Sequence, residues 1–292
     1  MTIKNSLQWL FSNQTINKNQ NFKLFISKST YLTNRFLLKI FKTRNSSENL
    51  RCYIPNFLVI RNKFGFLAKV DDGFSLIMFT RNHEPEVLER IELKKNSVFF
   101  DVGASLGFYS LFAAKKCPNG LIISIEPDRD LYEKILENLK MNNFENVKCI
   151  NCAISDVDKS KIKLFKGMNS TIFGSGDNYS LVESRTLDSI VSDFKLLQID
   201  WLKIDVESAE VIVLKGAQKT LEMTKNLILE IHSKKNGEKC LEILDNQGFE
   251  IEIIKKSLYK EERPIEILNN MEDIEGNILY YPLILAKNKK IS

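Results

Sequence analysis

Residues 98–110, VFFDVGASLGFYS, decide the fold. A short apolar run ends in a glycine-containing turn, and a second apolar run follows at once, which is the order strand, tight turn, helix. The turn fits two patterns. In G-x-S-x-G, Ser105 is the nucleophile of a hydrolase. In a glycine loop, Gly103 and Gly107 let the backbone approach a nucleotide-like cofactor, and Ser105 is incidental.

Strand-like and helix-like runs alternate from residue 97 onward. We expect strands at residues 98–102, 121–125, 147–151, 201–204, 227–231, 249–254 and 279–286, and an inserted strand at 161–165. We expect helices at residues 108–116, 128–141, 187–194, 209–220 and 238–246. Such alternation requires crossover connections, so the sequence predicts an α/β fold with a mostly parallel sheet and helices on both faces. This main domain is assigned to residues 96–292.

Two further units are expected before the main domain. Residues 1–47 form a basic leader with eight basic and no acidic side chains, and with a helix over 31–42. A basic amphipathic helix packs on the body, or contacts an anionic membrane surface or a partner. Residues 48–95 are expected to form a small β-hairpin extension, with strands at 66–70 and 74–79, and then a short helix at 84–93.

Charge and composition limit the function classes. The net charge is +5, but the leader accounts for it, and the rest of the chain has three more acidic than basic residues. A nucleic-acid partner is therefore not expected. No run reaches the roughly eighteen apolar residues that cross a bilayer, and the five cysteines suit reduced, buried thiols. We expect a cytoplasmic protein, with a location peripheral to the membrane as the alternative, and the sequence carries no signal for an oligomeric state.

The residues after the first two strands of the alternation indicate the cofactor. Glu126 follows the second strand, where an acid can accept the ribose hydroxyls of an adenosine-containing cofactor over the glycine loop. Asp101 precedes the loop, and its charge disfavours a pyrophosphate but suits a cationic methionine end. S-adenosylmethionine is therefore preferred to NAD.

The hydrolase interpretation has a possible triad in the chain order Ser105, Asp205, His232. However, Ser105 follows the first strand of the parallel alternation, whereas a nucleophile of this kind normally lies deeper in the sheet. No oxyanion loop of the HGGG type precedes it. The sequence thus favours the cofactor-binding loop.

A series of motifs over residues 66–232 resembles the FkbM-type methyltransferases. They are DVGASLG at 101–107, EP at 126–127, NCAISD at 151–156, RTLD at 185–188, WLKIDVESAE at 201–210, LKG at 214–216 and LEIH at 229–232. The resemblance implies a class I, Rossmann-like methyltransferase that moves a methyl group from S-adenosylmethionine to an oxygen, often a hydroxyl on a sugar, glycolipid or small metabolite. The acceptor is not readable, because acceptor specificity lies in loops such as 166–181.

The resemblance also implies roles for individual residues. The methionine end is assigned to Asp101, Gly103, Ser105 and Gly107, the ribose to Glu126, and the adenine to Cys152 and Ala153. The wall that faces the methyl group and the acceptor is assigned to Asp205, Glu207, Glu230 and His232. His232 or Asp205 is the candidate base. An alternative is that Asp205, Glu230 and His232 bind Mg²⁺, although no metal site is assigned.

The chain departs from the family pattern at Ser208, where the family has glycine. If the backbone needs a positive φ there, serine narrows the site or weakens activity. Ser208 therefore keeps a non-catalytic cofactor-binding protein as one alternative function. The other is an NAD-linked oxidoreductase, which the acid before the glycine loop disfavours.

Overall fold

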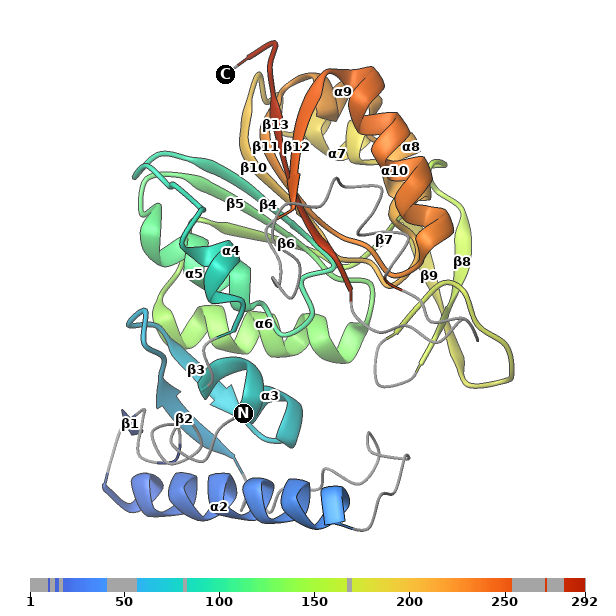
Figure 1. The fold of residues 1–292 in the computed structure, drawn as a ribbon. Helices are drawn as coiled ribbons and strands as arrows, with labels where there is room; N and C mark the ends of the chain where they lie inside the picture. Colours follow the sequence, from blue (N-terminus) through green and yellow to red (C-terminus); the bar gives the residue numbers. More distant parts are fainter. Residues whose placement is uncertain are drawn as a thin grey trace.

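A seven-stranded sheet forms the centre of the molecule (Figure 1). The computed structural model describes residues 10, 14–15, 18–40, 57–80, 83–166, 170–253, 271 and 281–291. The strand order is β12-β13-β11-β10-β4-β5-β6. The bounds are β4 Val98–Val102, β5 Leu121–Ile125, β6 Val147–Ile150, β10 Ile199–Ile204, β11 Thr224–Glu230, β12 Phe249–Ile253 and β13 Leu283–Asn288. Only β13 runs antiparallel to its neighbours, which confirms the mostly parallel sheet.

Helices cover both faces of the sheet, because both faces of its strands are apolar. In β4, Phe99 packs into one buried cluster and Phe100 into the other, as the two-residue period of a strand requires. α5 Phe108–Lys116 and α6 Arg129–Asn142 lie on one side (Figure 1). The other side carries α7 Leu187–Asp193, α8 Glu210–Lys215, α9 Gln218–Glu222 and α10 Lys234–Gln247.

The strand register brings the predicted site residues to one edge. Val102 is the partner of Ile125 in β5 and of Ile204 in β10. Ile204 is in turn the partner of Leu229 in β11. Because these strands are parallel and in register, the residues that follow them emerge side by side. They are Gly103, Glu126, Asp205 and Glu230.

The β-hairpin extension is confirmed, but one of its strands was predicted wrongly. β3 Leu67–Val70 pairs with β2 Leu58–Arg61, to which β1 Gln14–Thr15 also pairs. Residues 74–79 form a helix instead, α3 Gly73–Thr80. Asp72 explains the difference, because its side chain accepts a hydrogen bond from the Ser75 N–H at 2.7 Å and its carbonyl accepts from Leu76 N–H at 3.0 Å. These bonds satisfy orphan donors of the first turn and start a helix.

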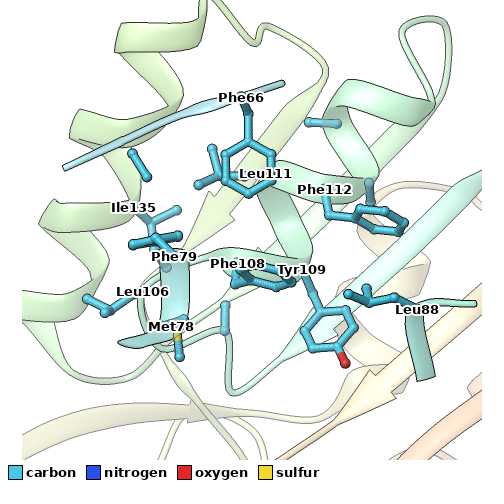
Figure 2. Close-up of a cluster of buried hydrophobic side chains, with 14 of the residues drawn as sticks. Phe66, Met78, Phe79, Leu88, Leu106, Phe108, Tyr109, Leu111, Phe112 and Ile135 are labelled. Carbon is cyan, nitrogen blue, oxygen red and sulfur yellow. The ribbon is translucent and has the colours of Figure 1, made fainter. Parts of the chain in front are cut away.

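The extension docks on the main sheet through α6 and α5. The side chains of Asn138 and Asn142 accept hydrogen bonds from the β3 backbone N–H groups of Lys69 and Leu67, at 2.8 and 2.7 Å. Figure 2 shows the apolar side of this contact, where Phe66 and Phe79 of the extension meet Phe108 of α5. The Phe66 and Phe108 ring centroids are 5.9 Å apart at an interplanar angle of 77°, an edge-to-face contact. The extension therefore packs directly on α5 and α6 of the main domain.

Other boundaries also differ from those predicted. The leader helix α2 is Lys18–Ile40, so it begins well before residue 31, and α4 is only Pro85–Leu88. The helix predicted at 209–220 is two helices, α8 and α9, separated by Gly216 and Ala217. The predicted strand at 161–165 is β8 Lys161–Phe165, and it pairs with β9 Tyr179–Arg185, which was not predicted. A two-residue strand, β7 Ala153–Ile154, pairs with β9 on its other side.

Several predictions lie partly or wholly outside the described residues. They concern parts of the basic leader (residues 1–9, 11–13, 16–17 and 41–47), Cys52, and residues 254 and 279–280. Cys117, Cys149, Cys152 and Cys240 are free thiols, as predicted. Among the helices that the structure describes, none combines the length and apolarity needed to cross a membrane.

Candidate active site

A cavity of about 670 Å³ opens at the carboxyl edge of the sheet, and nine of the eleven predicted site residues line it. They are Gly103, Ser105, Glu126, Cys152, Ala153, Asp205, Glu207, Glu230 and His232. The extension supplies part of the same wall through Phe74, Met78 and Glu84. Asp101 and Gly107 do not line the cavity.

Glu126 anchors one end of the cavity. Its carboxylate accepts hydrogen bonds from Ser105 N–H at 2.7 Å and from Asp128 N–H at 2.9 Å. Burial raises the pKa of Glu126 to about 8, although these two hydrogen bonds favour its charged form. Glu126 thus joins the glycine loop to the start of α6 and keeps acceptor capacity on both oxygens, because each has two lone pairs.

The glycines of the loop serve packing. Gly103 has a φ of +75°, and a Cβ atom there would lie 1.8 Å from the carbonyl oxygen of Asp205. The absent side chain lets the loop after β4 contact the loop after β10. Gly107 has a φ of +80° and caps the start of α5, with Ile135 of α6 against it. Only glycine combines these conformations with such close neighbours.

Asp101 lies beneath the cavity and is 1% exposed. One carboxylate oxygen accepts a hydrogen bond from Ser110 Oγ at 2.6 Å, and the other has no hydrogen-bond partner among the described residues. Burial raises its pKa against the opposing charge of Lys203, its register partner in β10. The positive charge of Lys203 therefore compensates the buried Asp101 carboxylate next to the glycine loop.

His232 lies at the opposite end of the cavity and contacts three carboxylates. Its Nδ1 lies 2.7 Å from Glu210 Oε1. Its Nε2 lies 3.3 Å from Glu207 Oε2 and 3.7 Å from Asp205 Oδ1. Both ring nitrogens thus face acidic groups, and Ser105 is not among their partners, so the side chains of the hydrolase interpretation do not form a triad.

The charges at this end are strongly coupled. Burial lowers the pKa of His232, but the hydrogen bond to Glu210 and the charges of Glu207 and Asp205 outweigh it and raise the pKa to about 9. Burial raises the pKa of Asp205, but Lys203 and His232 hold it below its ordinary value. Burial raises the pKa of Glu207. Without a bound cofactor or acceptor, these shifts make His232 cationic and Asp205 anionic at neutral pH.

The backbone at Glu207 and Ser208 is held in an uncommon conformation. The φ angles are +47° and +79°, in the left-handed region. Ser208 N–H donates to Glu210 Oε1 at 2.9 Å, Asn236 Nδ2 donates to the Ser208 carbonyl at 2.7 Å, and Thr171 Oγ1 donates to the Glu207 carbonyl at 2.8 Å. The family has glycine at position 208, which suggested a positive φ there, and Ser208 does have a positive φ.

Sequence reasoning missed several residues of this wall. Lys203 Nζ lies 3.2 Å from Asp205 Oδ2 and 4.9 Å from the Tyr109 ring centroid. Tyr109 OH in turn donates to Glu84 Oε2 at 2.6 Å. A lysine inside the apolar run at 201–204 was a visible signal. Glu84 carried none, because only the docking of the extension brings it to the cavity, and Tyr109 of α5 looked like one more apolar residue of that helix.

The loop between β8 and β9 contacts both ends of the cavity. Ser170 Oγ donates to Asp128 Oδ2 at 3.0 Å, and Thr171 donates to Glu207 as described above. Ser170, Thr171 and Ile172 all line the cavity. Part of the loop to which acceptor specificity was assigned thus lies over the site.

Comparisons with known proteins identify the family of this chain. The model of the methyltransferase FkbM domain matches residues 101–251. "Methyltransferase sdnD" of Sordaria araneosa is 27% identical over 197 residues, which cover 54% of this chain and 76% of that protein. "Hexuronic acid methyltransferase AglP" of Haloferax volcanii is 22% identical and covers 56% of this chain and 68% of its own length.

Among solved structures, M. jannaschii TYW2 in complex with AdoMet has a TM-score of 0.42 and 17% identity, over 80% of this chain and 85% of that one. The family match spans more than half of the chain, begins at Asp101 before the glycine loop and includes all eleven predicted site residues. The chain therefore belongs to the FkbM family and is an S-adenosylmethionine-dependent methyltransferase with the class I fold.

Proposed function

We propose that this enzyme methylates a hydroxyl oxygen of a glycan, a lipid-linked sugar or a small metabolite. The observation that carries the proposal is that a carboxylate-rich wall, made by Asp205, Glu207 and Glu230, shares one cavity with the loop anchored by Glu126. Carboxylates accept hydrogen bonds from hydroxyl groups. A wall of this kind suits an acceptor that donates several such bonds.

The residues at the Glu126 end fit S-adenosylmethionine. Glu126 would accept the ribose hydroxyls, Cys152 and Ala153 would lie beside the adenine, and the backbone at Gly103 and Ser105 would border the methionine end. When bound, the cofactor supplies a methyl group activated by a sulfonium centre. The partly exposed Asp205 and the anionic groups around it favour a cationic ligand at this place.

The acceptor wall would position a hydroxyl and take its proton. Asp205 is the better candidate for the proton acceptor, because its lowered pKa keeps it ionised while the pKa of His232 is raised to about 9. His232 would hold Asp205 and Glu207 in place from below. Methyl transfer is a displacement in which alignment contributes most, so the base needs only to relieve the acceptor of one proton.

Two observations support a sugar-like acceptor. The ring of Tyr281 lies 4.8 Å from that of His232 and is 40% exposed, so an apolar face stands beside the carboxylates. Sugar rings present both hydroxyl edges and apolar faces. One relative, AglP, carries a hexuronic acid in its name.

Two measurements test the proposal. Calorimetric titration of the purified chain with S-adenosylmethionine and with NAD should give heat with the former alone, and heat with NAD alone would favour the oxidoreductase. Methyl transfer is then followed on a panel of hydroxylated sugars, lipid-linked glycans and small alcohols. Transfer to a nucleic acid or a protein, with none to the panel, would reject the acceptor class. Cofactor binding without transfer to any acceptor would favour a non-catalytic role.

A further inference from the structure

We propose that Asp205, Glu207 and His232 form a binding site for one divalent metal ion of the Mn²⁺ type. Sequence analysis left Mg²⁺ on Asp205, Glu230 and His232 as an alternative, but the structure groups Glu207 with Asp205 and His232 in place of Glu230. The binding of the ion stands apart from the proposed methyl transfer. Only its effect on turnover rests on the proposed function.

The three ligand atoms converge on one point at the cavity wall. His232 Nε2, Asp205 Oδ1 and Glu207 Oε2 all lie within 4.8 Å of one another, and the two distances from Nε2 are 3.3 and 3.7 Å. Ligands about 2.1 Å from a metal are separated by roughly 3.0–3.5 Å when they occupy neighbouring positions. The two distances from Nε2 therefore lie at or within a few tenths of an ångström of this spacing, and the two carboxylate oxygens lie within 4.8 Å of each other.

The His232 ring is already oriented as in a metal ligand, and an ion that binds Nε2 would displace the proton that the surrounding carboxylates favour there. Glu210 is 0% exposed, and its Oε1 holds His232 Nδ1 at 2.7 Å, which directs Nε2 toward Asp205 and Glu207. Asn236 Nδ2 donates to the other oxygen of Glu210 at 2.9 Å. A carboxylate that fixes the far nitrogen of a histidine is the usual support behind a metal-bound imidazole. This support distinguishes the site from a chance group of acids.

The carboxylate ligands are held separately. Glu207 is fixed by its left-handed backbone and by the Thr171 hydrogen bond to its carbonyl, as described above. Asp205 follows β10 directly, and its other oxygen contacts Lys203. Their side chains are 28% and 29% exposed, toward the cavity. The ion would thus have protein ligands on one side and open positions on the side where an acceptor enters.

The donor set points to the class of ion. Two carboxylate oxygens suit Mg²⁺, Ca²⁺ and Mn²⁺, whereas an imidazole nitrogen suits Mn²⁺ and later transition metals better than Mg²⁺. Glu230 lines the same cavity, so this wall concentrates carboxyl groups. An ion here would bind an acceptor hydroxyl oxygen and lower its pKa, which makes the proton easier to remove.

The test uses the untagged full-length chain, because a polyhistidine tag would itself bind metal. Titration with MnCl₂ alone, without cofactor or acceptor, is followed by loss of the free Mn²⁺ signal in electron paramagnetic resonance. We expect one bound ion per chain. Glu207→Gln and Asp205→Asn should each weaken binding about tenfold or more. Asp130→Asn, which removes a carboxylate from the same cavity outside the cluster, should leave it unchanged.

A second measurement keeps the proposal testable if a variant fails to fold. Pulsed electron paramagnetic resonance of the wild-type complex should show coupling of Mn²⁺ to one imidazole nitrogen, and His232→Gln should abolish it. Absence of binding at 1 mM Mn²⁺, a concentration of about the weakest affinity that counts as a site, overturns the proposal. Binding without nitrogen coupling, or with equal affinity in Glu207→Gln, also overturns it. Neither result affects the proposed methyl transfer, which has its own assay.

Discussion

Glu210 Oε1 holds His232 Nδ1 at 2.7 Å in a fully buried contact, and this contact directs the other ring nitrogen of His232 into the cavity. The same Glu210 oxygen accepts the N–H of Ser208, and the second oxygen accepts from Asn236. The fully buried Glu210 carboxylate thus fixes both the His232 imidazole and the loop that carries Glu207. We therefore treat Glu210 as a positioning residue for the acceptor wall.

Glu210→Gln should separate transfer from cofactor binding. Glutamine keeps the size and one accepting oxygen but loses the charge, so a charge-assisted hydrogen bond becomes a neutral one. We expect the turnover number to fall about tenfold or more, while calorimetry gives an unchanged affinity for S-adenosylmethionine. Glu222→Gln, at the end of α9 and outside the cavity lining, is the matched control. A parallel loss of cofactor affinity would show that Glu210 has only a general structural role.

Ser208→Gly should stabilise the chain. Serine at a φ of +79° pays a conformational cost that glycine avoids. The relief, about 1–3 kcal/mol, is partly offset by about 0.4–1 kcal/mol of extra entropy in the unfolded chain. We expect a net gain near 1 kcal/mol in the free energy of unfolding, measured by urea denaturation.

Lys195→Gly provides the control for that change, because Lys195 has a φ of +52° and does not line the cavity. It should give a comparable gain in stability with unchanged turnover. If serine at 208 also narrows the site, Ser208→Gly alone should raise turnover. Equal turnover in the wild type and Ser208→Gly would remove the idea that this departure from the family pattern weakens activity.

Glu126→Gln should weaken cofactor binding and reduce the loss of stability as the pH rises. Burial raises the pKa of Glu126 from 4.5 to about 8, so the folded chain binds a proton there that the unfolded chain releases. This contribution is fully present below pH 4.5 and is lost as the pH rises through 8. The wild type should therefore lose stability over this window, by up to about 1.4 kcal/mol per pH unit.

Denaturation at several pH values checks this expectation. Glu126→Gln should show a shallower decline between pH 5 and 8, because glutamine does not titrate, and it should bind S-adenosylmethionine at least about tenfold more weakly, since an NH₂ group replaces one of the two carboxyl oxygens. The Asp130→Asn variant should follow the wild type. An identical pH profile in Glu126→Gln and the wild type would contradict the raised pKa.

The sequence predicted the main sheet well because its strands are short, continuous apolar runs bounded by turn residues. β4, α5, β5 and β8 begin and end at the predicted residues. Residues 74–79 were mispredicted because the run Phe-Ser-Leu-Ile-Met-Phe has no clear period. The Asp72 side chain caps the first turn of a helix there. This cap is a local signal, and the apolar residues that follow it made a strand look equally suitable.

The candidate site was predictable only where it follows strands. Gly103, Glu126 and Asp205 come directly after strand ends, Glu230 is the last residue of β11, and parallel register places the four together. Asp101 lies within β4, one residue before its end, and the pleat points it into the core. Glu210 starts a helix and looks solvated in the sequence. Its burial arises because α10 brings Asn236 against it, a long-range contact that the motif does not encode.

Asn142→Ala should loosen the extension from the main domain. The Asn142 side chain accepts from Leu67 N–H and donates to the Leu67 carbonyl, both at 2.7 Å, so alanine leaves two β3 backbone groups without these partners. We expect a loss of about 1–3 kcal/mol in the free energy of unfolding. Because α3 carries Phe74 and Met78 to the cavity, the KM for the acceptor should rise as well. Lys140→Ala, exposed on the same helix, should change neither quantity.

Lys203→Met should be the most damaging single change in the buried wall. The ammonium group compensates Asp101, which is fully buried, and Asp205, which the cavity partly solvates. Its removal leaves Asp101 as an unpaired buried charge, which costs about 3–5 kcal/mol. Asp101→Asn should restore part of that loss in the double variant, because the amide needs no counter-charge. Urea denaturation of the wild type, both single variants and the double variant yields a coupling energy. We expect it to be at least about 1 kcal/mol, and additive losses would show that Lys203 serves Asp205 alone.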